Sequence, residues 1–328
     1  MTSRLSVTVD AFSLAKQFTI ARGAKTEAVV VACTLADGTM MGRGECVPYA
    51  RYGESVDSVV GAIESVRGAI DAGLDRASLQ ALLPPGAARN ALDCACWDLE
   101  AKRKGARAAD LAGIGALQPV ETAYTISLGS PEEMAAATRA VAHRAVLKVK
   151  VGRGDEDPAR MQAVRAAAPQ ARLIIDANEG WTPNNLKANL LAAAGVGAFV
   201  VEQPLPAGHD AILAHTPHPV PICADESVHG SADLHELVGR YDYVNLKLDK
   251  TGGLTEGLVF LAEARRLGFG VMVGCMVGTS LGMAPALLLA QGAELVDLDG
   301  PLLLREDRPN GLRYEGSLVW PPEPALWG

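Results

Sequence analysis

Short apolar runs alternate with Ala- and Leu-rich amphipathic stretches after Gln118, and this alternation is the feature that most limits the fold. Reference residues in six consecutive runs, from Asp176 to Asp297, lie 22 to 28 residues apart. Strands that alternate with helices at such a period form βα units around a parallel sheet. Eight runs can be counted: 121–127, 145–151, 172–176, 198–202, 221–225, 243–248, 270–275 and 295–299.

Eight units favour a closed barrel over a doubly wound sheet, and the chain after Asp299 has no convincing eighth helix. We therefore predict an α/β fold in which residues 118–305 form a TIM-like (β/α)7β barrel, with helical segments in all seven gaps. Residues 1–117 read as an antiparallel meander followed by helices, which indicates an N-terminal α+β capping domain. Within it, residues 42–55 are expected to form a functional loop. The C-terminal tail, 306–328, should return to complete this domain.

The charge and composition exclude several classes of partner. The net charge is −8 and no basic block occurs, which argues against nucleic-acid binding and disfavours anionic membrane surfaces. The longest apolar run, 190–201, is too short to span a bilayer. We expect a cytoplasmic protein that acts on a small molecule, and a homo-oligomer is compatible with the sequence. The six cysteines lack paired zinc spacing and are expected to be buried free thiols.

Charged residues end most of the predicted barrel strands, and catalytic groups in this fold come from those ends. Taken singly, each could cap a helix or end its strand in solvent. Three neighbouring carboxylates, however, repel one another unless a cation neutralises them, and all-oxygen ligation selects a hard ion such as Mg²⁺. The strand-end residues are Lys150, Asp176, Glu202, Asp225, Lys247, Asp297 and Asp299.

Lys148 and Lys150 lie two residues apart in a predicted strand and would project to the same face. A solvated strand face is the plain alternative, but the surrounding alternation makes this an internal barrel strand. Strands two and six of a barrel lie across its mouth, so Lys150 and Lys247 would face each other. That geometry suits removing a proton from one face of a carbon and returning it to the other.

Five motifs together are similar to those of the enolase superfamily, and within it the muconate lactonizing subgroup with two lysines. The resemblance covers nearly the whole chain and rests on K-x-K at 148–150, D-A-N at 176–178, V-E-Q-P at 201–204, A-D-E-S at 224–227 and N-x-K-x-x-K-x-G-G at 245–253.

The resemblance implies a role for each residue of the strand-end set. Mg²⁺ would be bound by Asp176, Glu202 and Asp225. Lys150 and Lys247 would be the acid/base pair of a 1,1-proton transfer through an enolate, chemistry known for this superfamily. Lys148 would lower the pKa of Lys150 and help to neutralise the enolate oxygen. Acid-sugar dehydration is disfavoured, because the seventh strand carries no histidine.

The substrate class follows from further resemblances. Asp297-Leu298-Asp299 looks like the D-x-D of dipeptide epimerases, where two carboxylates hold the α-ammonium of the dipeptide. Residues 21–27 and 44–54 resemble capping loops of L-Ala-D/L-Glu epimerases, with Arg22 a candidate for binding the Glu side chain. Thr125 is a further candidate for the pocket. The leading substrate is therefore L-Ala-D/L-Glu, as in murein peptide recycling.

Several alternatives remain open. They are a dipeptide epimerase of other specificity, an N-acylamino acid racemase, an o-succinylbenzoate synthase and, in a different class, a non-catalytic barrel that binds peptides or metal. The chain also departs from related epimerases, which can carry an acidic residue after strand seven where Gly278 stands here. That difference leaves the shape of the pocket open.

Overall fold

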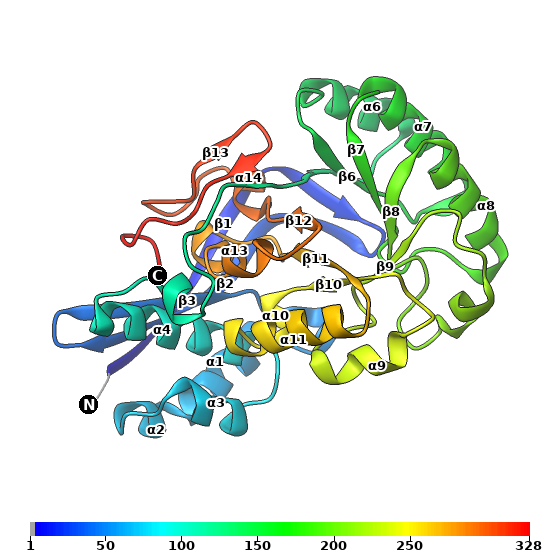
Figure 1. Cartoon of the computed structure of the whole chain (residues 1–328). Helices are drawn as coiled ribbons and strands as arrows, with labels where there is room; N and C mark the ends of the chain where they lie inside the picture. The colour runs from blue at the N-terminus through cyan, green and yellow to red at the C-terminus, as the bar shows by residue number, and fades with distance from the viewer. Residues whose placement is uncertain (1–3) are drawn as a thin grey trace.

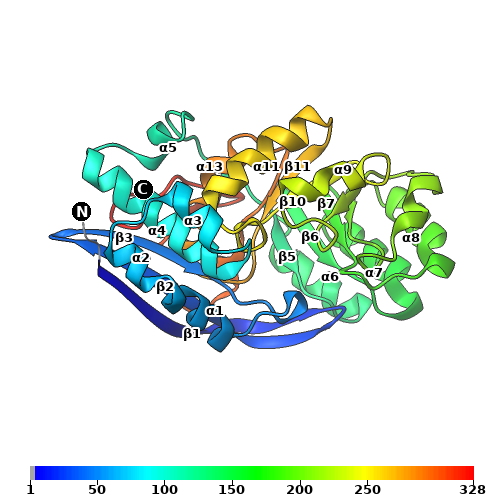
Figure 2. The same ribbon diagram turned by 90° about the horizontal axis from the view of Figure 1, so that it is seen from below.

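The computed structural model describes residues 4–328 and has two parts (Figure 1). A three-stranded antiparallel sheet with helices packed on it forms one part, and an eight-stranded parallel sheet surrounded by helices forms the other. Figure 2 shows the long hairpin of β1 and β2 running from the smaller part to the barrel. The predicted α/β barrel with an N-terminal α+β domain is therefore confirmed.

The antiparallel sheet has the order β1-β2-β3 and consists of long strands. Residues 4–20 form a single strand of the predicted meander, because the pairing of β1 with β2 resumes after an irregularity between Ser13 and Phe18. Ala21 and Arg22 form the tip of this hairpin, since Ile20 is paired with Gly23. The strands are β1 (Arg4–Ile20), β2 (Gly23–Asp37) and β3 (Met40–Cys46).

Helix α4 packs directly on β3, and two glycines allow the close approach. A Cβ at Gly44 would lie 2.1 Å from the Ala91 carbonyl oxygen, and one at Gly42 would lie 2.2 Å from that of Ala95. The prediction that 42–55 is a loop was therefore wrong for 42–46, where glycine serves packing. The helices here are η1 (Ala50–Tyr52), α1 (Val56–Ser65), α2 (Arg67–Asp71), α3 (Arg76–Leu82), α4 (Ala87–Lys104) and α5 (Ala108–Leu111).

The barrel strands are parallel and follow the chain order from β5 to β12. The two end strands are joined by a hydrogen bond from the Ala123 N–H to the Val296 carbonyl oxygen, 2.8 Å. Val146 contributes to a buried apolar cluster with residues of the other strands. The strands are β5 (Tyr124–Ile126), β6 (Val146–Lys150), β7 (Arg172–Asp176), β8 (Ala198–Glu202), β9 (Ile222–Ala224), β10 (Tyr243–Leu246), β11 (Gly270–Gly274) and β12 (Leu295–Asp297).

Helices or helical turns fill the seven gaps, as expected, but the fourth gap holds only the 3₁₀ helix η3. Five prolines between 204 and 221 explain this, because proline lacks the N–H that an α-helix needs. The segments are α6 (Pro131–Ala140), η2 (Gly154–Glu156), α7 (Asp157–Ala167), α8 (Pro183–Gly195), η3 (Ala211–His215), η4 (Ser231–Asp233), α9 (Leu234–Leu237), α10 (Leu248–Thr251), α11 (Leu254–Arg266), α12 (Ser280–Met283), α13 (Ala286–Ala290) and α14 (Gly300–Leu303).

The C-terminal tail contacts both parts. Its strands β13 (Tyr314–Glu315) and β14 (Leu318–Val319) form a small sheet with β4 (Val120–Glu121). Its last residues reach α4, where the Trp327 indole N–H donates to the Cys94 carbonyl oxygen at 3.0 Å. The tail thus returns to the N-terminal part as predicted. Within residues 4–328, no helix has the length and apolar character needed to cross a membrane.

Candidate active site

Strand register brings the predicted residues to one level at the carboxyl ends of the barrel strands. Lys150 is paired with Asp176, and Asp176 is paired with Glu202. Asp225 directly follows β9 and Lys247 directly follows β10. All five residues are buried. The sheet geometry therefore assembles residues that lie up to about a hundred positions apart in the chain.

Lys148 is a fixed cation at the centre of this group. Its Nζ lies 2.7 Å from Glu202 Oε2, 2.7 Å from Asp297 Oδ2 and 3.3 Å from Asp176 Oδ2. Burial favours the neutral amine, but Asp297 and the other carboxylates outweigh burial and raise the pKa of Lys148 well above its ordinary value. The side chain therefore carries a permanent positive charge beside the strand ends.

Lys150 and Lys247 stand on strands four places apart in the eight-stranded order, and so on opposite sides of the barrel. Lys150 Nζ lies 2.6 Å from Asp176 Oδ2, and Lys247 Nζ lies 2.7 Å from Asp225 Oδ2. Burial lowers the pKa of Lys247, but Asp225 outweighs burial and raises this pKa well above the ordinary lysine value. In this arrangement Asp225 favours the ammonium form of Lys247, the form that can donate a proton.

The carboxylates Asp176, Glu202 and Asp225 supply a donor set that fits a hard divalent cation. Burial and the neighbouring Asp176 raise the pKa of Glu202 to about 7. In Asp176, burial is outweighed by the ammonium groups of Lys150 and Lys148, which lower its pKa to about 2. Over the described range 4–328, no three acidic, His or Cys side chains converge as a preformed metal cage. Lysine ammonium groups contact Glu202 and Asp225 instead. Their oxygen chemistry and mutual repulsion nevertheless match Mg²⁺.

Lys250 is a member of this group to which sequence reasoning gave no role. Its Nζ lies 2.7 Å from Asp225 Oδ1 and donates to the carbonyl oxygens of Asp225, at 2.6 Å, and Asn245, at 2.9 Å. Burial lowers the pKa of Lys250 below the ordinary lysine value. The motif at 245–253 contains this lysine three residues after Lys247, so the spacing was a usable signal.

Asp297 and Asp299 form an acidic pair at the edge of the same cavity. Asp299 Oδ2 accepts a hydrogen bond from the Thr125 N–H at 2.6 Å, and Thr125 also lines the cavity. Burial and the charge of Asp297 raise the pKa of Asp299 to about 7. Asp297 Oδ1 is buried and accepts no hydrogen bond from the described residues. A cationic ligand group would satisfy both carboxylates.

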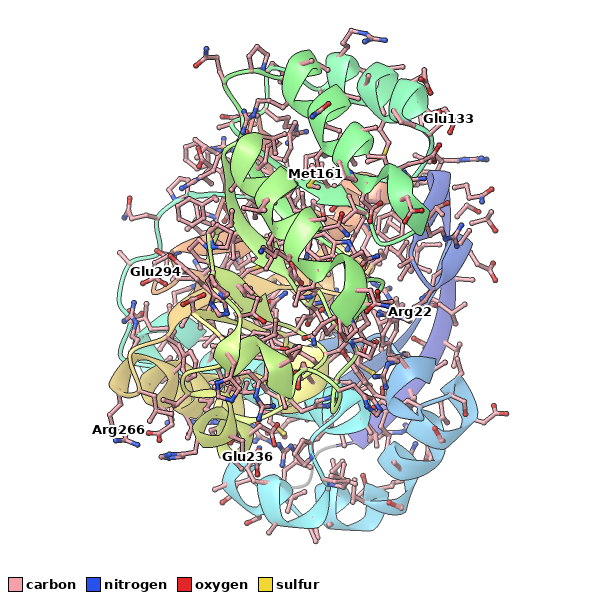
Figure 3. The ribbon with its side chains drawn as sticks, turned by 90° about the vertical axis from the view of Figure 1, so that its right-hand side faces the viewer. Arg22, Glu133, Met161, Glu236, Arg266 and Glu294 are labelled. Atoms are coloured by element: carbon pink, nitrogen blue, oxygen red, sulfur yellow. The ribbon has the colours of Figure 1, made fainter. Side chains whose placement is uncertain are left out.

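The cavity above these residues has a volume of about 520 Å³ and is bounded by barrel strand ends and by capping segments. Arg22, at the hairpin tip, lies where the hairpin meets the barrel (Figure 3). Its guanidinium is within 2.7 Å of Glu226 Oε1 and 3.0 Å of Glu179 Oε2. Arg22 therefore lines the cavity, but two carboxylates already pair with it.

Gly278 does not line this cavity. A Cβ there would lie 3.3 Å from Glu45 Oε1, a carboxylate supplied by β3. Glu45 is buried and accepts hydrogen bonds from the Thr279 N–H and hydroxyl, at 2.9 and 2.6 Å. A carboxylate of the capping sheet thus packs against the segment that follows the seventh strand, a contact that no local sequence signal could indicate.

Two family models match the chain. The one described as enolase C-terminal domain-like covers residues 132–323, and the mandelate racemase / muconate lactonizing enzyme N-terminal domain covers residues 4–113. The chain is 48% identical over 307 residues to the L-Ala-D/L-Glu epimerase of Escherichia coli K12, covering 93% of this chain and 95% of that protein. It is 42% identical over 301 residues to an N-acetyl-D-glutamate racemase of Pseudoalteromonas, covering 91% and 95%.

Solved structures similar to this chain come from the same family. An enolase family member from Agrobacterium tumefaciens with homology to dipeptide epimerases, with bound sodium and L-Ala-L-Glu, matches at TM-score 0.98 and 59% identity, covering 99% of this chain and 100% of that one. A dipeptide epimerase from Enterococcus faecalis, complexed with Mg and L-Leu-L-Tyr, matches at TM-score 0.91 and 29% identity, covering 98% of each chain. The chain therefore belongs to the mandelate racemase / muconate lactonizing enzyme family of the enolase superfamily.

Proposed function

We propose that this protein is a Mg²⁺-dependent dipeptide epimerase that inverts the α-carbon of the C-terminal residue, with L-Ala-D/L-Glu as its substrate. One observation carries the proposal: two buried lysines stand on opposite sides of a barrel mouth that also holds three carboxylates. A substrate α-carbon between them would present one face to each amine. This is the arrangement that a proton exchange with inversion needs.

Each lysine has a separate role in the proposal. One of the pair Lys150 and Lys247 removes the α-proton, and the other returns a proton to the opposite face. For the reverse direction the two exchange roles. Lys148, whose charge is fixed by Asp297 and Glu202, stabilises the negative charge that develops on the substrate carboxylate.

Asp176, Glu202 and Asp225 would hold the Mg²⁺. When bound, this ion would neutralise the substrate carboxylate and make the neighbouring α-proton more acidic. The dipeptide epimerase structure from E. faecalis, which is complexed with Mg, supports the choice of metal. Lys250 keeps Asp225 in place through two contacts with it and one with the Asn245 carbonyl oxygen, and it has no reacting role in the proposal.

The ends of the substrate are recognised by opposite charges. Asp297 and Asp299 would receive the α-ammonium group of the dipeptide, which lowers the cost of keeping two buried carboxylates side by side. The acidic side chain of the C-terminal Glu would lie toward the capping segments that carry Arg22. The Thr125 N–H holds Asp299 in position.

A second candidate is racemisation of an N-acylated glutamate, which the Pseudoalteromonas relative favours. Such a substrate has no ammonium group, so Asp297 and Asp299 would face a neutral amide. This acidic pair is therefore the reason to prefer a dipeptide. A non-catalytic barrel that binds peptide or metal is the alternative from a different class.

One experiment separates these functions. The protein is incubated with Mg²⁺ in D₂O with L-Ala-L-Glu, other dipeptides and N-acetyl-L-glutamate, and the α-proton signal is followed by NMR. The proposal requires loss of the signal and appearance of the L-Ala-D-Glu diastereomer. Faster exchange of N-acetyl-L-glutamate than of any dipeptide supports the racemase, and no exchange with any compound supports the non-catalytic barrel.

The proposal also covers organisation and place of action. We assign capping and specificity to residues 1–117, the catalytic barrel to 118–305, and the return to the capping domain to 306–328. The enzyme would act in the cytoplasm on peptides released during murein recycling. Cell fractionation of the producing organism, with the protein detected by antibody, tests the location.

A further inference from the structure

Three cations from the capping segments line the outer end of the cavity: Arg22, Lys25 and Arg51. An acidic substrate side chain could in principle bind any of them. Their surroundings differ, however, and the difference identifies which of the three cations is not already paired with a carboxylate of the protein. This question presupposes the proposed epimerase function.

Both arginines are already paired. Glu179 binds Arg51 through two hydrogen bonds, from Nε at 2.8 Å and from Nη2 at 2.7 Å. The same carboxylate lies 3.0 Å from Arg22, whose other guanidinium nitrogen lies 2.7 Å from Glu226. Arg22 also donates to the Asn178 carbonyl oxygen at 2.8 Å and to the Tyr49 hydroxyl at 3.1 Å. Most hydrogen-bond donors of the Arg22 guanidinium thus already have partners within the protein.

The backbone holds Glu179 rigidly for this task. Asn178 and Glu179 both have positive φ, +43° and +68°, a conformation that costs non-glycine residues about 1 kcal/mol each. The Glu179 N–H donates to the Gln203 carbonyl oxygen at 2.9 Å, and the Glu179 carboxylate also accepts from the Ala207 N–H at 2.8 Å. A strained and well-anchored carboxylate fits a permanent structural partner of the arginines better than one that releases them for each substrate.

Lys25 has no such partner. Within residues 4–328 it forms no ion pair, and its Nζ lies 5.1 Å from the centroid of the Tyr49 ring. The side chain is exposed and borders the cavity. A cation held over an aromatic face keeps its full charge and its hydrogen-bond donors for a ligand.

The hairpin register places Lys25 on the face of the hairpin that borders the cavity. Lys25 is directly opposite Phe18, so their side chains share one face of the hairpin. The Phe18 ring lies 5.9 Å from the Lys150 Nζ. Phe18, Lys25 and Lys150 all line the same cavity, so Lys25 lies on the hairpin face that borders the space above the reacting lysine.

We propose that Lys25 binds the side-chain carboxylate of the C-terminal substrate residue and so determines the preference for acidic dipeptides. Arg22 is then a positioning residue that, with Glu179 and Glu226, fastens the hairpin tip to the barrel.

Steady-state kinetics with L-Ala-L-Glu and its neutral isostere L-Ala-L-Gln test this assignment. Lys25→Met should lower kcat/KM for L-Ala-L-Glu by about tenfold to a hundredfold, mainly through KM, and affect L-Ala-L-Gln far less. Lys25→Arg should retain most of the activity on L-Ala-L-Glu. Lys16→Met is the matched control, because Lys16 is an exposed lysine of the same hairpin that does not line the cavity. This variant should leave kcat/KM unchanged for both dipeptides.

A charge reversal gives the converse test. Lys25→Glu should shift the preference from L-Ala-L-Glu toward L-Ala-L-Lys. An equal loss of both substrates in Lys25→Met, or an unchanged kcat/KM for L-Ala-L-Glu, overturns the assignment. Failure of the proposed function is separate: there the unsubstituted protein epimerises none of the three dipeptides.

Discussion

Asp299→Asn should make the protein more stable at high pH while it weakens the binding of a dipeptide ammonium group. Asp299 is buried, and burial together with Asp297 raises its pKa from the ordinary 3.8 to about 7. A carboxyl group whose pKa is higher in the folded protein than in the unfolded chain favours the folded state most at a pH below its pKa in the unfolded chain. Its ionisation then destabilises the fold progressively as pH rises from about 4 to about 7.

The magnitude follows from the same two pKa values. Each unit of pKa difference corresponds to about 1.4 kcal/mol, so the raised pKa of Asp299 destabilises the fold by up to about 4 kcal/mol at pH 8 and by about 2 kcal/mol at pH 5, relative to low pH. Asparagine has the same shape, does not ionise and can still accept the Thr125 N–H. The variant should therefore gain more stability over the unsubstituted protein at pH 8 than at pH 5.

Urea unfolding of both proteins at pH 5 and pH 8, without metal or substrate, measures this difference. Epimerisation of L-Ala-L-Glu, measured at pH 8, should fall by at least about tenfold in the variant, because a charged hydrogen bond to the ammonium group is lost. A variant that is less stable than the parent at pH 8, or whose stability difference is the same at both pH values, would refute the reasoning about Asp299.

Three further outcomes are expected. Gly44→Ala should destabilise the protein by about 3 kcal/mol or more in urea unfolding, because the added Cβ would overlap the Ala91 carbonyl oxygen. The control is Gly61→Ala in α1, where an added Cβ meets nothing within 4 Å and the effect on the free energy of unfolding should be neutral or stabilising. Lys250→Met should lower the unfolding free energy by about 3 to 5 kcal/mol, because it leaves the buried Asp225 with one ammonium partner fewer; a change below about 1 kcal/mol would contradict a buried ion pair there. Chelation of divalent cations should abolish epimerisation and added Mg²⁺ should restore it, as followed by polarimetry; full activity after exhaustive chelation would exclude the metal site.

The barrel and its strand-end residues could be predicted because both follow from repeated local patterns. The period of apolar runs gives βα units, and a parallel barrel places every strand end at the same mouth, so Lys150, Asp176 and Glu202 had to lie together. The two-residue period of a strand also predicts that Lys148 shares a face with Lys150. The roles assigned to these residues remain predictions.

Other features depend on contacts between distant segments and left no local signal. Residues 42–46 looked like a glycine-rich loop, since only the packing of α4 explains why Gly42 and Gly44 stand in a strand. The pairing of Arg22 with Glu179 and Glu226 joins a hairpin tip to two barrel loops. The sequence suggested Arg22 as a carboxylate ligand of the substrate, and only the three-dimensional contacts reveal that its charge is already compensated.

The central claim is that Lys150 and Lys247 act on opposite faces of one carbon. The most direct test measures α-proton exchange in D₂O with L-Ala-L-Glu and L-Ala-D-Glu supplied separately to Lys150→Ala and Lys247→Ala. The account predicts that neither variant epimerises, that each exchanges the proton of one diastereomer only, and that the two variants exchange different diastereomers. Epimerisation by either variant, or exchange of the same diastereomer by both, would contradict it.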